Sequence, residues 1–105
     1  MEANKKIQEM QFLEQNLQNL LLQKQAFQME LSETTSALKE IENAGEEVFK
    51  IIGQLMVKTN KSKMKQELLE KEKILDLRTK SIEKQEKYLI EQLEEIRDKI
   101  VNSNK

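Results

Sequence analysis

The sequence predicts a mainly α-helical protein in which two long helices form an antiparallel coiled coil, with a single β-hairpin at the bend. Apolar residues recur at heptad spacing in both halves of the 105-residue chain, which predicts the helices. A β-branched segment bounded by glycines lies between the halves and predicts the hairpin. Helices of roughly 40 residues, or about 60 Å each, can pair within one chain. Residues 1–105 are thus expected to form one domain with both chain ends at a tip; separate dimerisation of each helix is the alternative.

The first helix is expected from about residue 5 to about residue 43. Lys24 and Thr34 interrupt its apolar heptad positions, and such polar interruptions commonly fix the register of a coiled coil. Gly45 follows the last heptad residue and is expected to end the helix with a positive φ. The apolar heptad positions are Met10, Leu13, Leu17, Leu20, Phe27, Leu31, Leu38 and Ile41.

The second helix is expected from about residue 62 to about residue 102, with Ser62 as its N-cap. The companion heptad position is polar as far as Glu86 and then apolar at Leu93 and Ile100. This helix is therefore expected to pack best toward its C-terminal end. The unbroken apolar series at intervals of seven is Leu68, Leu75, Ile82, Leu89 and Ile96.

The hairpin is expected at residues 47–59, with Gly53-Gln54 as a two-residue type II′ turn. Apolar residues occupy both faces of this segment, and an isolated two-stranded hairpin is marginal in water and has two unpaired edges. We therefore expect the hairpin to pair with strands of other chains in an oligomer. The residues expected to form this contact are Val48, Phe49, Ile51, Ile52, Gly53, Leu55, Met56 and Val57.

The composition indicates a binding protein, not an enzyme. The chain has no His and no Cys, which removes the imidazole general base, the thiolate nucleophile and the ordinary zinc site. A net charge of −1 gives no overall attraction to nucleic acid or to an anionic membrane. No apolar run approaches the roughly 20 residues that span a bilayer. We expect no catalytic residue, no metal, no cofactor and, given the polar N-terminus and the lack of cysteine, a cytoplasmic location.

Two groups of charged residues could suggest acid–base catalysis, metal binding or nucleic-acid binding, but each has a simpler explanation. Carboxylates such as Glu91, Glu94 and Glu95 have Lys at neighbouring turns, as on a solvated helix face. A nucleic-acid site would need aromatic or Arg residues among its lysines, and none is nearby. The basic cluster is interpreted as a solvated loop or a docking surface for an acidic partner, with RNA contact as the lesser alternative. It comprises Lys58, Lys61, Lys63 and Lys65.

Apolar residues outside the heptad positions gather toward the expected tip. Any one of them, such as Phe12, Tyr88 or Val101, could be an ordinary surface residue. Together they form an apolar tip on a charged stalk, which could hold non-native chains through contacts of about 1–3 kcal/mol each. The residues expected to bind such client chains are Ile7, Met10, Phe12, Leu13, Leu93, Ile96, Ile100 and Val101.

Several sequence elements outside the heptads match one family in order. Residues 48–58, VFKIIGQLMVK, fit the hairpin pattern V-[YF]-K-x-[IV]-G-x-[LIV]-x-V-K. Residues 23–25 (QKQ), 75–78 (LDLR) and 82–86 (IEKQE) fit further elements. Over nearly its whole length, the chain resembles a β-class prefoldin subunit.

This resemblance implies an ATP-independent co-chaperone. Prefoldins are hexamers of two α-type and four β-type subunits, and their hairpins build a β-barrel platform. Their coiled-coil tips bind unfolded polypeptides and deliver them to a group II chaperonin. The single hairpin is that of a β-class subunit, because α-class subunits carry a second one. The alternative function is a structural coiled-coil adaptor that binds one folded protein partner.

Overall fold

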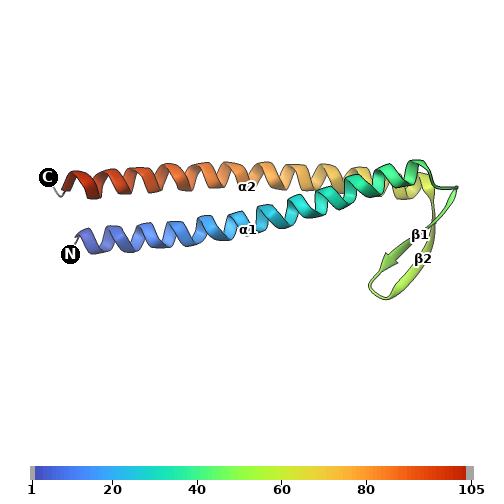
Figure 1. Ribbon diagram of the computed structural model, residues 1–105, viewed down its shortest axis with the longest axis horizontal. Coiled ribbons are helices and arrows are strands. Elements are labelled where there is room, and N and C mark those ends of the chain that lie inside the picture. Colours follow the sequence, from blue (N-terminus) through green and yellow to red (C-terminus); the bar gives the residue numbers. More distant parts are fainter. Residues whose placement is uncertain (1, 104–105) are drawn as a thin grey trace. The chain divides into compact units, whose positions relative to one another are not determined.

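The computed structural model describes residues 2–103, which form two long helices with a two-stranded hairpin between them (Figure 1). The helices are α1, Glu2–Glu42, and α2, Lys61–Ser103. The strands are β1, Glu47–Ile52, and β2, Leu55–Asn60. The predicted fold class is thus confirmed. Met1 and residues 104–105 of the predicted domain lie outside the described residues.

The chain forms two compact units, each of which contains part of both helices. The terminal unit comprises the chain up to residue 26 and from residue 79 onward, and its two helical segments run antiparallel, so that the start of α1 and the end of α2 lie at the same end of the unit (Figure 1). The hairpin unit comprises residues 27–78, and here the end of α1 and the start of α2 are joined by the hairpin.

The predicted heptad positions form the interior of each unit. The buried threonine at position 34 is one of the predicted polar interruptions, and its hydroxyl donates a hydrogen bond of 2.8 Å to the carbonyl oxygen of Glu30. Its oxygen is therefore satisfied without a partner on the other helix. The buried apolar residues are Ile41 and Leu75 in the hairpin unit, and Ile82 and Leu93 in the terminal unit.

Burial along α2 is deepest in the middle of the helix, and the expectation of best packing toward its C-terminal end is wrong. Leu75 is 2% exposed and Ile82 is 4% exposed, whereas Ile96 and Ile100 are half-buried. A residue in mid-helix has packing neighbours on both sides along the partner helix, and a residue near the chain end has fewer. Apolar identity alone therefore does not predict the depth of burial.

The hairpin contains the two-residue turn that the sequence predicts. β1 and β2 pair antiparallel from Glu47 opposite Asn60 to Ile52 opposite Leu55. Gly53 has a φ of 60°, and no described non-glycine residue has a positive φ. Positive φ at the first turn residue alone distinguishes a type II′ turn from type I′.

The end of α1 does not use Gly45 as expected, because this glycine does not have a positive φ. Instead, the N–H groups of Asn43 and Ala44 donate to carbonyl oxygens three residues earlier, at 3.1 Å each. Such tightened turns satisfy part of a helix end without a left-handed residue.

Asn60 caps α2, and the expectation that Ser62 is the N-cap is wrong. The Oδ1 atom of Asn60 accepts a hydrogen bond of 2.7 Å from the N–H of Lys63. This bond satisfies one of the free N–H groups of the first helical turn. Asn60 is also the last residue of β2, so the strand passes into the helix without a linker.

Candidate binding surfaces

The hairpin carries apolar side chains on both faces. The strand register places Phe49, Ile51 and Met56 on one face, and Val48, Ile52, Leu55 and Val57 on the other. We call these seven residues and Gly53 the hairpin surface. Val48 is half-buried and Gly53 is exposed. Uncovered apolar groups in this number on one small element mark an interaction site. The exposed large apolar residues of the hairpin are Phe49, Ile51, Ile52, Leu55, Met56 and Val57.

An ion pair connects the second face of the hairpin to α2. Lys50 Nζ lies 2.9 Å from Glu67 Oε2, and Lys50 shares its face with Val57. The hydrogen bond from Lys50 lowers the pKa of the Glu67 carboxyl below its ordinary value, against the opposing effect of desolvation. This ion pair joins the face that carries Val57 to α2. No ion pair described within residues 2–103 joins the face that carries Phe49 to α2.

The outer edges of the hairpin present main-chain groups that a further strand could bind. The N–H of Lys61 donates to the carbonyl oxygen of Glu46 at 2.9 Å, which fixes the alternation of hydrogen-bonded pairs along the ladder. Residues in the intervening pairs direct their N–H and C=O groups outward. Within residues 2–103 the sheet has only these two strands. The residues with outward main-chain groups include Phe49, Ile51, Met56 and Lys58.

Three of the four lysines in the predicted basic cluster have partners inside the hairpin unit. Lys58 Nζ lies 3.3 Å from Glu47 Oε1, and Lys65 pairs with Glu42. The hydrogen bond and charge of Lys65, together with the charge of Lys61, lower the pKa of the Glu42 carboxyl. Lysines paired with carboxylates offer less net charge to a phosphate backbone. These contacts weaken the RNA alternative.

Lys61 joins the end of α1 to the start of α2. Its Nζ atom donates to the carbonyl oxygens of Glu42 and Ala44, at 3.1 and 3.2 Å. A cation is favourable at a helix C-terminus, where carbonyl groups lack intrahelical partners. The side chain therefore stabilises the junction from which the hairpin departs.

The eight residues expected to bind client chains all belong to the terminal unit, and we call them the terminal surface. Phe12 is 67% exposed, and Ile7 and Val101 are also exposed. The other five residues contribute less surface: Leu93 is buried, and Met10, Leu13, Ile96 and Ile100 are half-buried.

A partly buried ion pair interrupts the apolar heptads of the terminal unit. Lys24 Nζ lies 3.2 Å from Glu86 Oε1, and their side chains are 25% and 16% exposed. The sequence predicts both as polar heptad positions, and the structure shows that they meet. A polar pair at such positions favours one register over others.

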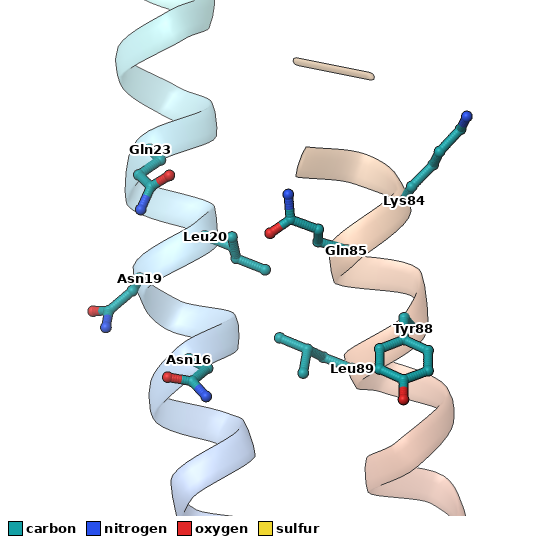
Figure 2. A pocket seen from close by; sticks show the side chains of 8 residues that line it. All are labelled: Asn16, Asn19, Leu20, Gln23, Lys84, Gln85, Tyr88 and Leu89. Carbon is teal, nitrogen blue, oxygen red and sulfur yellow. The ribbon is translucent and has the colours of Figure 1, made fainter. Parts of the chain in front are cut away.

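A groove of about 570 Å³ runs along the terminal unit between α1 and α2 (Figure 2). Leu20 and Leu89 extend toward each other across the space between the helices, and Gln85 extends toward α1 (Figure 2). Tyr88 stands at one side, and its hydroxyl oxygen accepts a hydrogen bond of 3.1 Å from Gln92 Nε2. The remaining lining residues are Asn16, Asn19, Gln23 and Lys84.

The carboxamide side chains of this groove were not predicted as binding residues from the sequence. Asn16, Asn19 and Gln23 follow one another at intervals of three and four, which places them along one side of α1. That spacing is the signal that could have found them. A heptad pattern separates apolar from polar positions, so uncharged hydrogen-bonding residues and charged residues fall into the same class.

Among residues 2–103, no group of three or more His, Cys, Asp or Glu side chains is arranged to hold a metal ion. Neither described helix is apolar enough over a sufficient length to cross a membrane.

Proteins that are similar to this chain match it over nearly its whole length. The family model described as "Prefoldin subunit" matches residues 4–104. The chain belongs to the prefoldin family. The predicted resemblance to β-class subunits is confirmed, because the similar proteins are named as prefoldin β subunits. Prefoldin subunits are chaperones and are not known as enzymes, which supports the chaperone role.

Three relatives show the extent of the similarity. The prefoldin β subunit of Thermococcus onnurineus is 45% identical over 89 residues, which are 83% of this chain and 77% of the relative. That of Saccharolobus islandicus is 36% identical over 101 residues, 94% of this chain and 80% of the relative. The crystal structure of the prefoldin β subunit from Thermococcus strain KS-1 has a TM-score of 0.88 at 38% identity, and the match covers 97% of this chain and 91% of that chain.

Proposed function

We propose that this chain is a β-type subunit of a prefoldin oligomer that holds unfolded polypeptides without ATP and passes them to a group II chaperonin. The observation that carries the proposal is the hairpin surface, where six large apolar side chains are exposed on a sheet of two strands. Within a family of chaperone subunits, such a surface is best explained by assembly with other subunits.

Assembly would use the hairpin surface to bind α-type subunits and further copies of the β type in a hexamer. The outward main-chain groups of Phe49, Ile51, Met56 and Lys58 can hydrogen bond to an added strand. The apolar faces would then be buried between hairpins, where each large side chain contributes about 1.5–3 kcal/mol.

Client binding would use the terminal surface. Its most exposed residues, Phe12 and Val101, come from the two helices and belong to the same unit. Each apolar contact is weak, but several subunits that hold one client raise the effective concentration of every further contact. Release to a chaperonin needs no ATP when the individual contacts are weak and reversible.

Assembly is tested by placing a charge on the hairpin surface. We expect Phe49→Lys to abolish co-assembly with an α-type subunit, because burial would desolvate an unpaired ammonium. The mass of the complex is measured by light scattering. Leu77→Lys is the matched control, because Leu77 is 57% exposed on α2 and Phe49 is 55% exposed. Full assembly of Phe49→Lys would contradict the proposal.

Client binding is tested with the triple variant Ile7→Ser, Phe12→Ser and Val101→Ser. We expect an intact oligomer that no longer suppresses aggregation of a chemically denatured protein. Leu22→Ser is the control, since Leu22 is 62% exposed in the terminal unit outside the terminal surface. Unchanged suppression by the triple variant would show that the terminal surface is not the client site. A stoichiometric complex with one folded protein, and no protection of denatured ones, would favour the adaptor alternative.

A further inference from the structure

We propose that the groove between Leu20 and Leu89 binds the main chain of an extended, non-native polypeptide through its side-chain amides. This inference rests on the proposed client-binding function and assigns it a second contact site, distinct from the terminal surface. The four carboxamides concerned are Asn16, Asn19, Gln23 and Gln85, and we call them the amide groove.

The chemistry of the lining matches a peptide main chain. Each carboxamide has N–H donors and a carbonyl acceptor, which are the same groups that an unfolded chain presents at every residue. None of the four has a side-chain hydrogen-bond partner within residues 2–103. Asn16 is half-buried and the other three are exposed, so all four can be reached from solvent. Main-chain recognition of this kind is independent of client sequence.

The aromatic and apolar parts of the groove support the same occupant. Tyr88 accepts a hydrogen bond from Gln92, so its own hydroxyl hydrogen remains available to a bound carbonyl group. Leu20 and Leu89 are half-buried and provide apolar contact at the base of the groove. From Asn16 to Gln23 the groove extends roughly 10 Å, enough for about three residues of extended chain. A contact of this length is weak and reversible, as holding and release require.

The charge distribution of α1 argues against a charged ligand. Between residues 7 and 26 the only charged side chains are Glu9, Glu14 and Lys24, and Lys24 is paired with Glu86. Lys84 lines the groove, but its ammonium is directed away from the other lining side chains (Figure 2). The α1 side of the groove is thus uncharged, and its residues desolvate no ion of their own when a neutral chain binds.

The test compares binding of two synthetic peptides to the assembled full-length protein by fluorescence anisotropy. One is an uncharged ten-residue peptide, and the other has the same sequence with alternate main-chain nitrogens methylated. The groove variant is Asn16→Leu, Asn19→Leu, Gln23→Met and Gln85→Met, which removes the amides, keeps the side chains similar in size and does not lower helix propensity. The control variant changes four other exposed glutamines of α1 to Met: Gln8, Gln11, Gln15 and Gln25.

We expect the unmodified protein to bind the unmethylated peptide about tenfold more tightly than the methylated one, as two net hydrogen bonds would give. The groove variant should lose this preference and the control variant should keep it. Equal binding of both peptides by the unmodified protein, or a preference that the groove variant retains, would overturn the inference, because the amides would then not be its source. Loss of the preference in the control variant, or a changed oligomer mass in the groove variant, would also overturn it.

A reduced and carboxymethylated protein, which stays unfolded, separates this inference from the proposed function. Failure of the unmodified oligomer to bind this probe contradicts the proposed function itself. If the unmodified oligomer binds the probe but the groove variant keeps the preference for the unmethylated peptide, only the amide-groove inference is contradicted.

Discussion

Gly53 and Gly45 are the two glycines of the chain, and the backbone makes different demands on them. Gly53 has a φ of 60° in the turn, whereas Gly45 has no positive φ, and a Cβ atom added to either would meet no other atom within 4 Å. We expect Gly53→Ala to reduce the local stability of the hairpin by about 1–2 kcal/mol through backbone strain. Gly45→Ala should be neutral or stabilising by up to about 1 kcal/mol.

The two substitutions are compared by hydrogen exchange of the Ile52 and Leu55 amides, which flank the turn. Equal effects of both substitutions would show that the turn does not depend on a left-handed glycine.

Lys24 and Glu86 form the one ion pair described between heptad positions of the terminal unit. We expect Lys24→Met to reduce the free energy of unfolding by about 1–3 kcal/mol, because Glu86 is 16% exposed and would lose its partner. The double variant with Glu86→Leu should regain this loss, because two apolar residues can pack where the pair lay. Urea titrations of both single variants and the double variant measure the coupling. Additive effects would show that the two residues act independently.

Residue patterns alone predict some features here and miss others for a physical reason. Heptad spacing predicts Ile41, Leu75 and Ile82 as interior residues, because residues that repeat every 3.5 positions stay on the side of a supercoiled helix that faces its partner. Capping depends on which of several candidate side chains reaches a free N–H group, and Asn60 and Ser62 are equally suitable by residue type. In the structure Asn60, a residue of the last pair of the strand ladder, is the one that reaches a free N–H group.

The hairpin is the element whose attachment to α2 depends on pH. The hydrogen bond from Lys50 lowers the pKa of Glu67 below its ordinary value of 4.5, so this contact stabilises the folded state above pH 4.5. The stabilisation is lost as the pH falls through the lowered pKa and the carboxyl binds a proton. We expect Lys50→Met to raise the pKa of Glu67 toward 4.5 in a carbon-13 NMR titration of the carboxyl group. An unchanged titration would show that Lys50 does not cause the shift.

At the scale of elements, the hairpin could be predicted from sequence and the amide groove could not. A type II′ turn has a local signature in Gly53-Gln54, and the strand period of two assigns the faces. The groove joins Asn16 and Gln85, which lie in different helices, and their proximity depends on the register of the coiled coil. That register is set by pairs such as Lys24 and Glu86, which only the paired helices reveal.

For the molecule as a whole, the residues proposed to make the binding contacts are uncharged and the net charge is −1. We expect retention of a denatured client to change less than about threefold between 0.05 and 1 M sodium chloride, since screening acts on charges and not on apolar contacts. Aggregation suppression measured across this range tests the expectation. A loss of tenfold or more would indicate that a charged surface, such as the lysines near the hairpin, binds the client.

The exposed hairpin also has a consequence for a copy of this chain that is not yet assembled with other subunits. Such a copy displays six large apolar side chains, the same kind of surface by which chaperones recognise other proteins. Under the proposed function, an unassembled subunit would itself be bound as a client by the assembled oligomer. Synthesis of the different subunits in matched amounts would then keep the amount of unassembled subunit low.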